Sequence, residues 1–163
     1  MFFEKKRSER LKTKFGPEYD RMVQESGRRP AEATLESRAK RVEKLPIRAL
    51  GNQEREDFAR RWREEQARFV DDPRVAVESA DRLVIEVMRA RGYPMGEFDQ
   101  RAADISVDHP RVVENYRVAH AIAERDSSGK ATTEDLRRAM VHYRALFEDL
   151  LEQHVLEHEE VRR

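Results

Sequence analysis

The stretch NQEREDFARRWREEQARFVDDPRVAVESADRLVIEVMRARG, residues 52–92, decides the fold. Its first half carries Phe58, Trp62, Gln66 and Phe69 at spacings of four, four and three residues. Side chains at these spacings share one face of an α-helix. The pattern therefore predicts an amphipathic helix whose aromatic stripe, Trp62 included, packs in a core.

The middle of the stretch, VDDP, predicts that this helix ends and a second one begins. Asp72 is suited to accept the first backbone N–H groups, and Pro73 suits the first helical position because its N–H is missing. The second helix is expected to stop at RGYPMG. Its expected buried residues are Val77, Ala80, Leu83, Val84, Val87 and Met88.

Helical patterns of this kind occupy the rest of the chain as well. Of its 163 residues, 38% are hydrophobic, 40% are charged and only six are glycine, a composition typical of long amphipathic helices. No segment alternates apolar and polar residues as a strand does. We predict an all-α fold, a helical bundle of about four main helices with one short extra helix around 97–105 and a helical N-terminal arm. The last long helix is expected to begin at Thr132.

The predicted domain boundary is the linker at residues 45–51, which contains a proline, a glycine and an apolar patch. Residues 1–44 precede it as a charged helical arm with few apolar residues, and residues 52–163 follow as the bundle domain. Residues 1–63 carry 18 Lys and Arg against 11 Asp and Glu, whereas residues 64–163 carry 15 against 22. We expect the basic half to meet the acidic half of the same chain or of a second copy. Nucleic acid and anionic lipid are the alternatives.

Histidine and tyrosine residues mark a candidate ligand site on ISVDHPRVVENYRVAHAIAERDSSG, residues 105–129. This segment is predicted to be one helix that Asp108 or His109 caps at its start. Tyr116 and His120 then fall on its buried face, with His120 directed toward the core. The full set of candidate residues is His109, Tyr116, His120, His142, Asp104 and Tyr93.

Two interpretations of this set stay open. A half-buried imidazole between helices can act as a base or bind a metal, haem or an acidic small molecule. Alternatively, His120 and Tyr116 are large core residues that each make one hydrogen bond. Tyr93 lies in a segment, residues 91–104, that could cover one end of the bundle.

No catalytic constellation and no complete metal site can be identified. The segment HVLEH, residues 154–158, has the order of an inverted zinc-protease motif, but that motif needs a third protein ligand well downstream. The chain has no cysteine, which excludes disulfides and a thiol nucleophile and is compatible with a reducing compartment. We predict no catalytic residue, no metal site and no resident cofactor, and find no clear nucleic-acid motif.

Residues 58–151 contain three segments that carry a resemblance: WREEQARFVDDPRVAVESADRLVIEVMRARGYP, QRAADISVDHPRVVENYRVAHAIA and TEDLRRAMVHYRALFEDLL. They look like parts of a group of uncharacterised bacterial helical proteins. In that group a membrane anchor often precedes the soluble part. The resemblance therefore implies a membrane-proximal soluble domain, and it implies no activity or ligand.

These observations favour a non-enzymatic interaction or scaffold module, with the N-terminal arm as its contact surface. Its expected partner is another protein or a second copy, and the arm could also meet a membrane surface. The expected location is the cytoplasm or the periphery of a membrane. The alternative is a helical bundle that binds a small molecule, a metal or haem through His109, Tyr116, His120 and His142.

Overall fold

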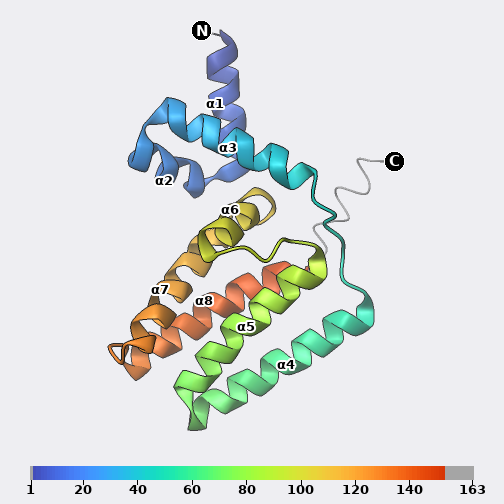
Figure 1. The fold of residues 1–163 in the computed structure, drawn as a ribbon, viewed down its shortest axis with the longest axis vertical. Helices are drawn as coiled ribbons and strands as arrows, with labels where there is room; N and C mark the ends of the chain where they lie inside the picture. The colour runs from blue at the N-terminus through green and yellow to red at the C-terminus, as the bar shows by residue number, and fades with distance from the viewer. Residues whose placement is uncertain (1, 153–163) are drawn as a thin grey trace. The chain divides into compact units, whose positions relative to one another are not determined.

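The computed structural model describes residues 2–152, which form helices joined by short connections, without a strand (Figure 1). The predicted all-α fold is confirmed. The helices are α1 (Phe2–Phe15), α2 (Pro17–Ser26), α3 (Arg28–Glu43), α4 (Asn52–Asp71), α5 (Pro73–Arg91), α6 (Phe98–Asp108), α7 (Val113–Ser127) and α8 (Thr133–Leu151).

Local sequence signals determine where α5 begins and ends. The Asp72 carboxylate accepts a hydrogen bond from the Val75 backbone N–H, and Pro73 occupies the first turn, as predicted. At the other end Gly92 adopts a left-handed conformation with φ 102°, which a residue without a Cβ adopts at little cost. The predicted start of α8 is also confirmed, because the Thr132 hydroxyl caps that helix.

The junction between α6 and α7 differs from the prediction. Asp108 is the last residue of α6 and His109 is its C-cap, so neither residue starts a helix. The His109 backbone N–H still donates to the Ile105 carbonyl oxygen, which completes the last turn of α6. Pro110 disfavours helical geometry in the residue before it, and His109 accordingly has φ −127° and ψ 54°. The next helix begins only at Val113.

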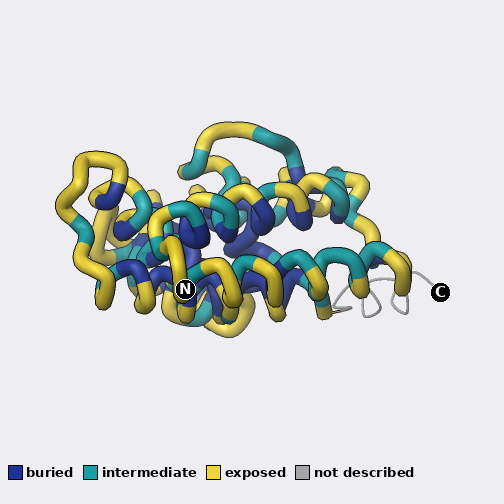
Figure 2. The backbone as a smooth tube through the Cα atoms, turned by 90° about the horizontal axis from the view of Figure 1, so that it is seen from below, coloured by how far each residue is buried: buried dark blue, intermediate teal, exposed yellow. Residues whose placement is uncertain are grey.

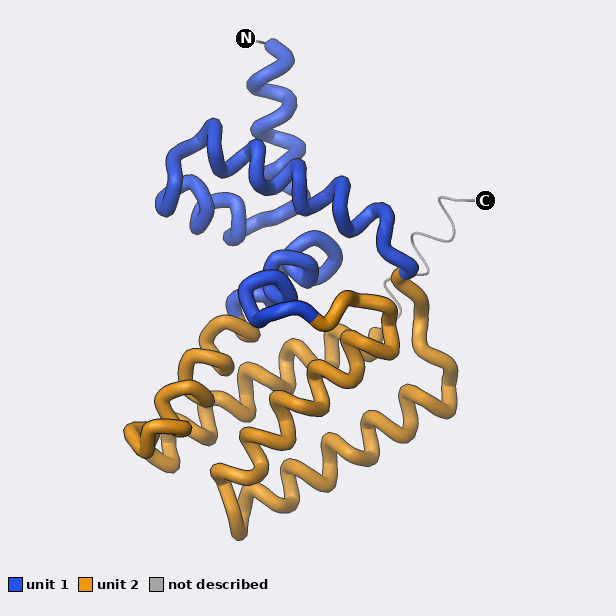
Figure 3. The backbone as a smooth tube through the Cα atoms, in the orientation of Figure 1, with its two compact units in different colours: residues 1–46, 96–114 blue, residues 47–95, 115–163 orange. Residues whose placement is uncertain are grey.

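The described chain divides into two compact units, each described separately below (Figure 3). Unit 1 comprises residues 1–46 and 96–114, and unit 2 comprises residues 47–95 and 115–163. The first change of unit, at 46/47, falls inside the predicted linker. Residues 96–114 belong to unit 1, whereas the sequence assigned them to the bundle.

Unit 1 has its own hydrophobic core, which includes α6. Helices α1, α2 and α3 pack together, and both α1 and α3 contact α6. The sequence underestimated this core because no single helix supplies more than three of its buried residues. Its buried members are Leu11, Phe15, Tyr19, Met22, Ala31, Leu35, Val42 and Val107.

Unit 2 is organised around α5, which packs against both α4 and α8. The predicted α5 stripe is buried, from Val77 to Met88. Figure 2 shows how buried and exposed positions alternate along the helices at the helical period. Trp62 of α4 stacks on Phe147 of α8 with ring centroids 5.0 Å apart, so α4 also touches α8. Among residues 2–152, no helix combines the length and apolar composition needed to cross a membrane.

Candidate functional site

The residues predicted as a ligand site belong to both units. Asp104 and His109 lie in unit 1, and the other four lie in unit 2. Within residues 2–152, no group of three or more His, Cys, Asp or Glu side chains is arranged to hold a metal ion. The HVLEH motif lies outside the described residues.

His120 lies at the edge of the buried face of α7 rather than within it. Its side chain is 21% exposed, and its Nε2 atom lies 3.0 Å from a Glu124 carboxylate oxygen one turn later. The fully buried positions of α7 are Val113, Tyr116, Ala119 and Ile122. Ile122 was not among the predicted buried positions of this helix. His120 is thus largely but not fully buried, and its expected direction toward the core stays a prediction.

The remaining predicted residues have identifiable surroundings. His142 of α8 bonds through Nδ1 to the Asn115 side chain of α7 at 2.9 Å, which joins two helices of unit 2. Tyr93 is buried just after α5, and its backbone N–H donates to the Met88 carbonyl oxygen. Tyr116 is fully buried. Ligand binding by this set stays a prediction, which melting curves with metal ions and haem would test.

A groove in unit 2 lies between α4 and α8. It has a volume of about 190 Å³. Its apolar walls are made by Trp62 and Phe69 of α4 and by Met140 and Val141 of α8. The lining residues are Trp62, Gln66, Phe69, Arg137, Met140, Val141 and Arg144.

The groove exposes apolar surface that the sequence assigned to a core. Trp62 is only 5% exposed, yet Phe69 is only partly buried and Val141 is 62% exposed. The buried Trp62 indole N–H makes no hydrogen bond with any described residue. Helical spacing places Trp62 and Phe69 on one face, but it does not indicate whether another helix covers that face.

Cationic side chains flank the groove. The Arg137 guanidinium lies 5.9 Å from the centre of the Phe69 ring, which joins the two walls at one end. Arg137 also pairs with Glu134, and Arg144 pairs with Glu148, both within α8 and largely exposed to water. Exposed ion pairs of this kind contribute little stability, so these arginines can leave their glutamates and pair with a ligand at a small cost in free energy. The lining itself contains two arginines and no acid.

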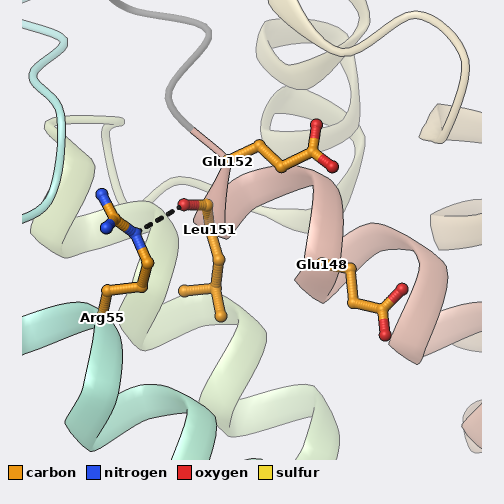
Figure 4. Close-up of a pocket in the computed structure, with 4 residues that line it drawn as sticks. All are labelled: Arg55, Glu148, Leu151 and Glu152. Carbon is orange, nitrogen blue, oxygen red and sulfur yellow. Dashed lines mark hydrogen bonds between the residues drawn. The ribbon is translucent and has the colours of Figure 1, made fainter.

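A second hollow in unit 2, of about 370 Å³, lies at the end of α8 beside Arg55, Glu148, Leu151 and Glu152. Figure 4 shows the Arg55 side chain reaching from α4 to the Leu151 carbonyl oxygen, 3.1 Å from its Nε atom. The fully buried Arg91 similarly donates from Nη1 to the Leu150 carbonyl oxygen. Arginines at this position stabilise the last carbonyls of a helix. These arginines thus have a structural role, and the α4–α8 groove is the better candidate.

Comparison of the chain with protein-family models, with curated proteins and with solved structures found no match.

Proposed function

We propose that this protein is a non-enzymatic interaction module. In this proposal helices α4, α5, α7 and α8 of unit 2 form a four-helix bundle. Its groove between α4 and α8 binds an acidic amphipathic helix of a partner protein. The observation that carries the proposal is an apolar groove that is open to solvent and has cationic but no acidic lining.

Two physical arguments favour this partner. An amphipathic helix can place apolar side chains at i, i+3 and i+4 against Phe69 and Val141, which removes their exposed surface from water. Carboxylates beside those side chains can pair with Arg137 and Arg144, and a basic partner would be repelled by them. The groove volume leaves room for an anchoring side chain rather than for a large cofactor.

A second copy of the chain fits the same surface less well. In an antiparallel pair of α8 helices centred on Val141, Glu134 would face Glu148 of the other copy. Arg137 and Arg144 would likewise lie close to each other across the pair. Like charges at these positions oppose a symmetric dimer. The proposed contact surface therefore lies on α4 and α8, whereas in the described part of the N-terminal arm most large apolar side chains are buried in unit 1 and only Phe2 and Phe3 are strongly exposed.

The proposed setting is a reducing compartment, the cytoplasm or the surface of a membrane facing it. It is supported by the absence of cysteine from the chain. The proposed binding of a helix in the groove does not depend on this cellular location.

The single tryptophan of the chain makes the proposal directly measurable, because Trp62 lines the groove. Two tryptophan-free helical peptides with the same apolar pattern, one acidic and one basic, are titrated into the full-length protein while Trp62 emission is recorded. We expect a saturable change with the acidic peptide only. Val141→Glu and Arg144→Glu should each weaken it at least tenfold. Val70→Glu, at a valine that is 82% exposed and outside the groove, should leave it unchanged.

Three outcomes would overturn the proposal. The first is an equal response to both peptides, and the second is no response to either. The third is self-association of the wild type that Val141→Glu abolishes, because a second copy would then occupy the groove. Sedimentation velocity over a range of protein concentrations detects the third outcome.

A further inference from the structure

A polar hollow of about 500 Å³ lies within unit 1 between α3 and α6. On α3 the lining positions 34, 37, 38 and 41 are separated by three, one and three residues, so they share one helix face. Residues of α6 form the opposite wall. The polar lining residues are Thr34, Ser37, Arg38, Arg41 and Gln100, accompanied by two alanines. We propose that this hollow binds a small oxyanion, the phosphate or carboxylate group of a small molecule.

Arg41 is the central residue of the proposed site. Its Nε atom donates to the Asp104 carboxylate at 3.1 Å, whereas its two Nη groups make no hydrogen bond with any described residue. The side chain is 45% exposed, so these Nη groups are accessible. A guanidinium held along one edge, with its other edge open, can bind a carboxylate or a phosphate through two parallel hydrogen bonds.

Asp104 serves as the positioning residue for this arginine. It is fully buried, and its Oδ1 atom also accepts a hydrogen bond from Gln100 Nε2 at 3.0 Å. Its other oxygen, Oδ2, is buried and makes no hydrogen bond within the described chain. A buried carboxylate with one unsatisfied oxygen is a poor source of stability. What the Asp104 carboxylate does provide is a fixed orientation for Arg41 and Gln100, two of the side chains that line the hollow.

The rest of the lining supports an anion as the ligand. Arg38 is only 14% exposed and is held by Glu18 at 2.8 Å and by Ser106 at 3.2 Å. The hydroxyl groups of Thr34 and Ser37 make no hydrogen bond with described residues, so both can donate to a ligand. No acid is among the lining residues. Two cations and two hydroxyl donors around an open volume favour an oxyanion over a cation.

The sequence could not show this arrangement, because Arg41 and Asp104 are 63 residues apart in the chain. The inference is also independent of the α4–α8 groove, since the two surfaces lie in different units and share no residue. Failure of one proposal therefore leaves the other standing.

The test is a titration of the full-length protein, at constant ionic strength set with chloride, followed by calorimetry and by the NMR signal of the Arg41 side chain. The probes are inorganic phosphate, glycerol phosphate and succinate. We expect saturable binding of the two phosphate probes or of succinate. Tighter binding of the phosphate probes identifies a phosphate ligand, and tighter binding of succinate identifies a carboxylate ligand. Arg41→Gln should weaken binding at least tenfold, and the double variant Thr34→Ala with Ser37→Ala should weaken it severalfold.

Arg10→Gln is the matched control, because Arg10 is an exposed arginine of the same unit that lies outside the hollow. It should bind like the wild type. If Arg41→Gln fails to fold, the double variant decides, since both of its positions are exposed. Absence of binding for all three probes would overturn the inference. So would equal losses in Arg10→Gln and in the hollow variants, because that result indicates general charge screening.

Discussion

Glu32 shows how a single buried side chain organises unit 1. It is 3% exposed, and its Oε2 atom accepts hydrogen bonds from the Ser8 hydroxyl at 2.5 Å and the Tyr19 hydroxyl at 2.7 Å. Burial by itself raises the pKa of Glu32, but these hydrogen bonds and the charges of Arg28 and Arg7 outweigh it and hold that pKa below its ordinary value. The carboxylate thus joins α1, α2 and α3 in its charged form.

The first prediction concerns this carboxylate. Tyr19→Phe keeps the ring in the core but removes one donor to a buried charge, which should lower the free energy of unfolding by about 1.5–3 kcal/mol. The lowered pKa of Glu32 means that its contribution is present above the ordinary carboxyl pKa and is lost as the pH falls through the folded value. The deficit of the variant should therefore shrink at acidic pH. Urea unfolding at pH 7 and at pH 3 measures both effects, and a pH-independent deficit would indicate a packing defect instead.

At the scale of a helix, the start of α4 is organised by Glu54. Its carboxylate accepts two hydrogen bonds from Arg48, at 2.8 and 2.9 Å, and one from the Gly51 backbone N–H at 3.0 Å. These hydrogen bonds lower the pKa of Glu54 from 4.5 to about 2, and Arg48 contributes most to this change. A charged group at this position also interacts favourably with the helix dipole.

The second prediction follows from that pKa. The pKa of Glu54 is lower in the folded than in the unfolded protein. The stability that its carboxylate contributes is therefore complete above pH 4.5 and disappears as the pH falls through about 2. Glu54→Gln should lower stability at pH 7 by only about 0.5 kcal/mol, because the pair is partly exposed and screened. Thermal melting from pH 7 to pH 2 should show the two proteins converge at low pH. Glu56→Gln, in the same turn but without these hydrogen bonds, is the control, and an equal loss there would contradict the assignment.

Helix boundaries could be predicted from the sequence where a capping residue, a proline or a glycine decides them locally. The prediction failed where packing between distant segments decides them. Asp72, Pro73 and Gly92 act through their own backbone geometry, so the limits of α5 were predicted from the sequence. Asp108 carries an equally good capping side chain, but α6 continues through it because its neighbours pack in the core of unit 1. Packing over several residues outweighs the preference of one capping residue.

At the scale of the whole molecule, the division into units does not follow the order of the chain. Residues 96–114 lie between two segments of unit 2, yet their contacts are with residues 1–46. The apolar contacts behind this division include Val107 of α6, in the same buried cluster as Leu35 of α3. Residues that share a core are expected to exchange amide hydrogens as one cooperative group.

The third prediction tests this grouping. Leu35 is fully buried, so Leu35→Ala should destabilise unit 1 by about 2–5 kcal/mol through lost packing and the cavity it leaves. Native-state hydrogen exchange should then accelerate in residues 2–46 and 98–108 together. Residues 73–91 of α5 should change less. Acceleration of α5 equal to that of α6 would contradict the grouping.

Taken by itself, the sequence determined the all-α class, the limits of α5 and the start of α8, because these depend on helical periodicity, capping and the backbone preferences of proline and glycine. It also directed attention to Asp104 and Trp62. Only the tertiary structure decided what those residues do. Contacts between distant segments decide that Arg41 is the partner of Asp104, that the face beside Trp62 is open, and that α6 belongs to unit 1. A helical period determines which side chains share a face, whereas the surface that covers this face is determined by packing of the whole chain.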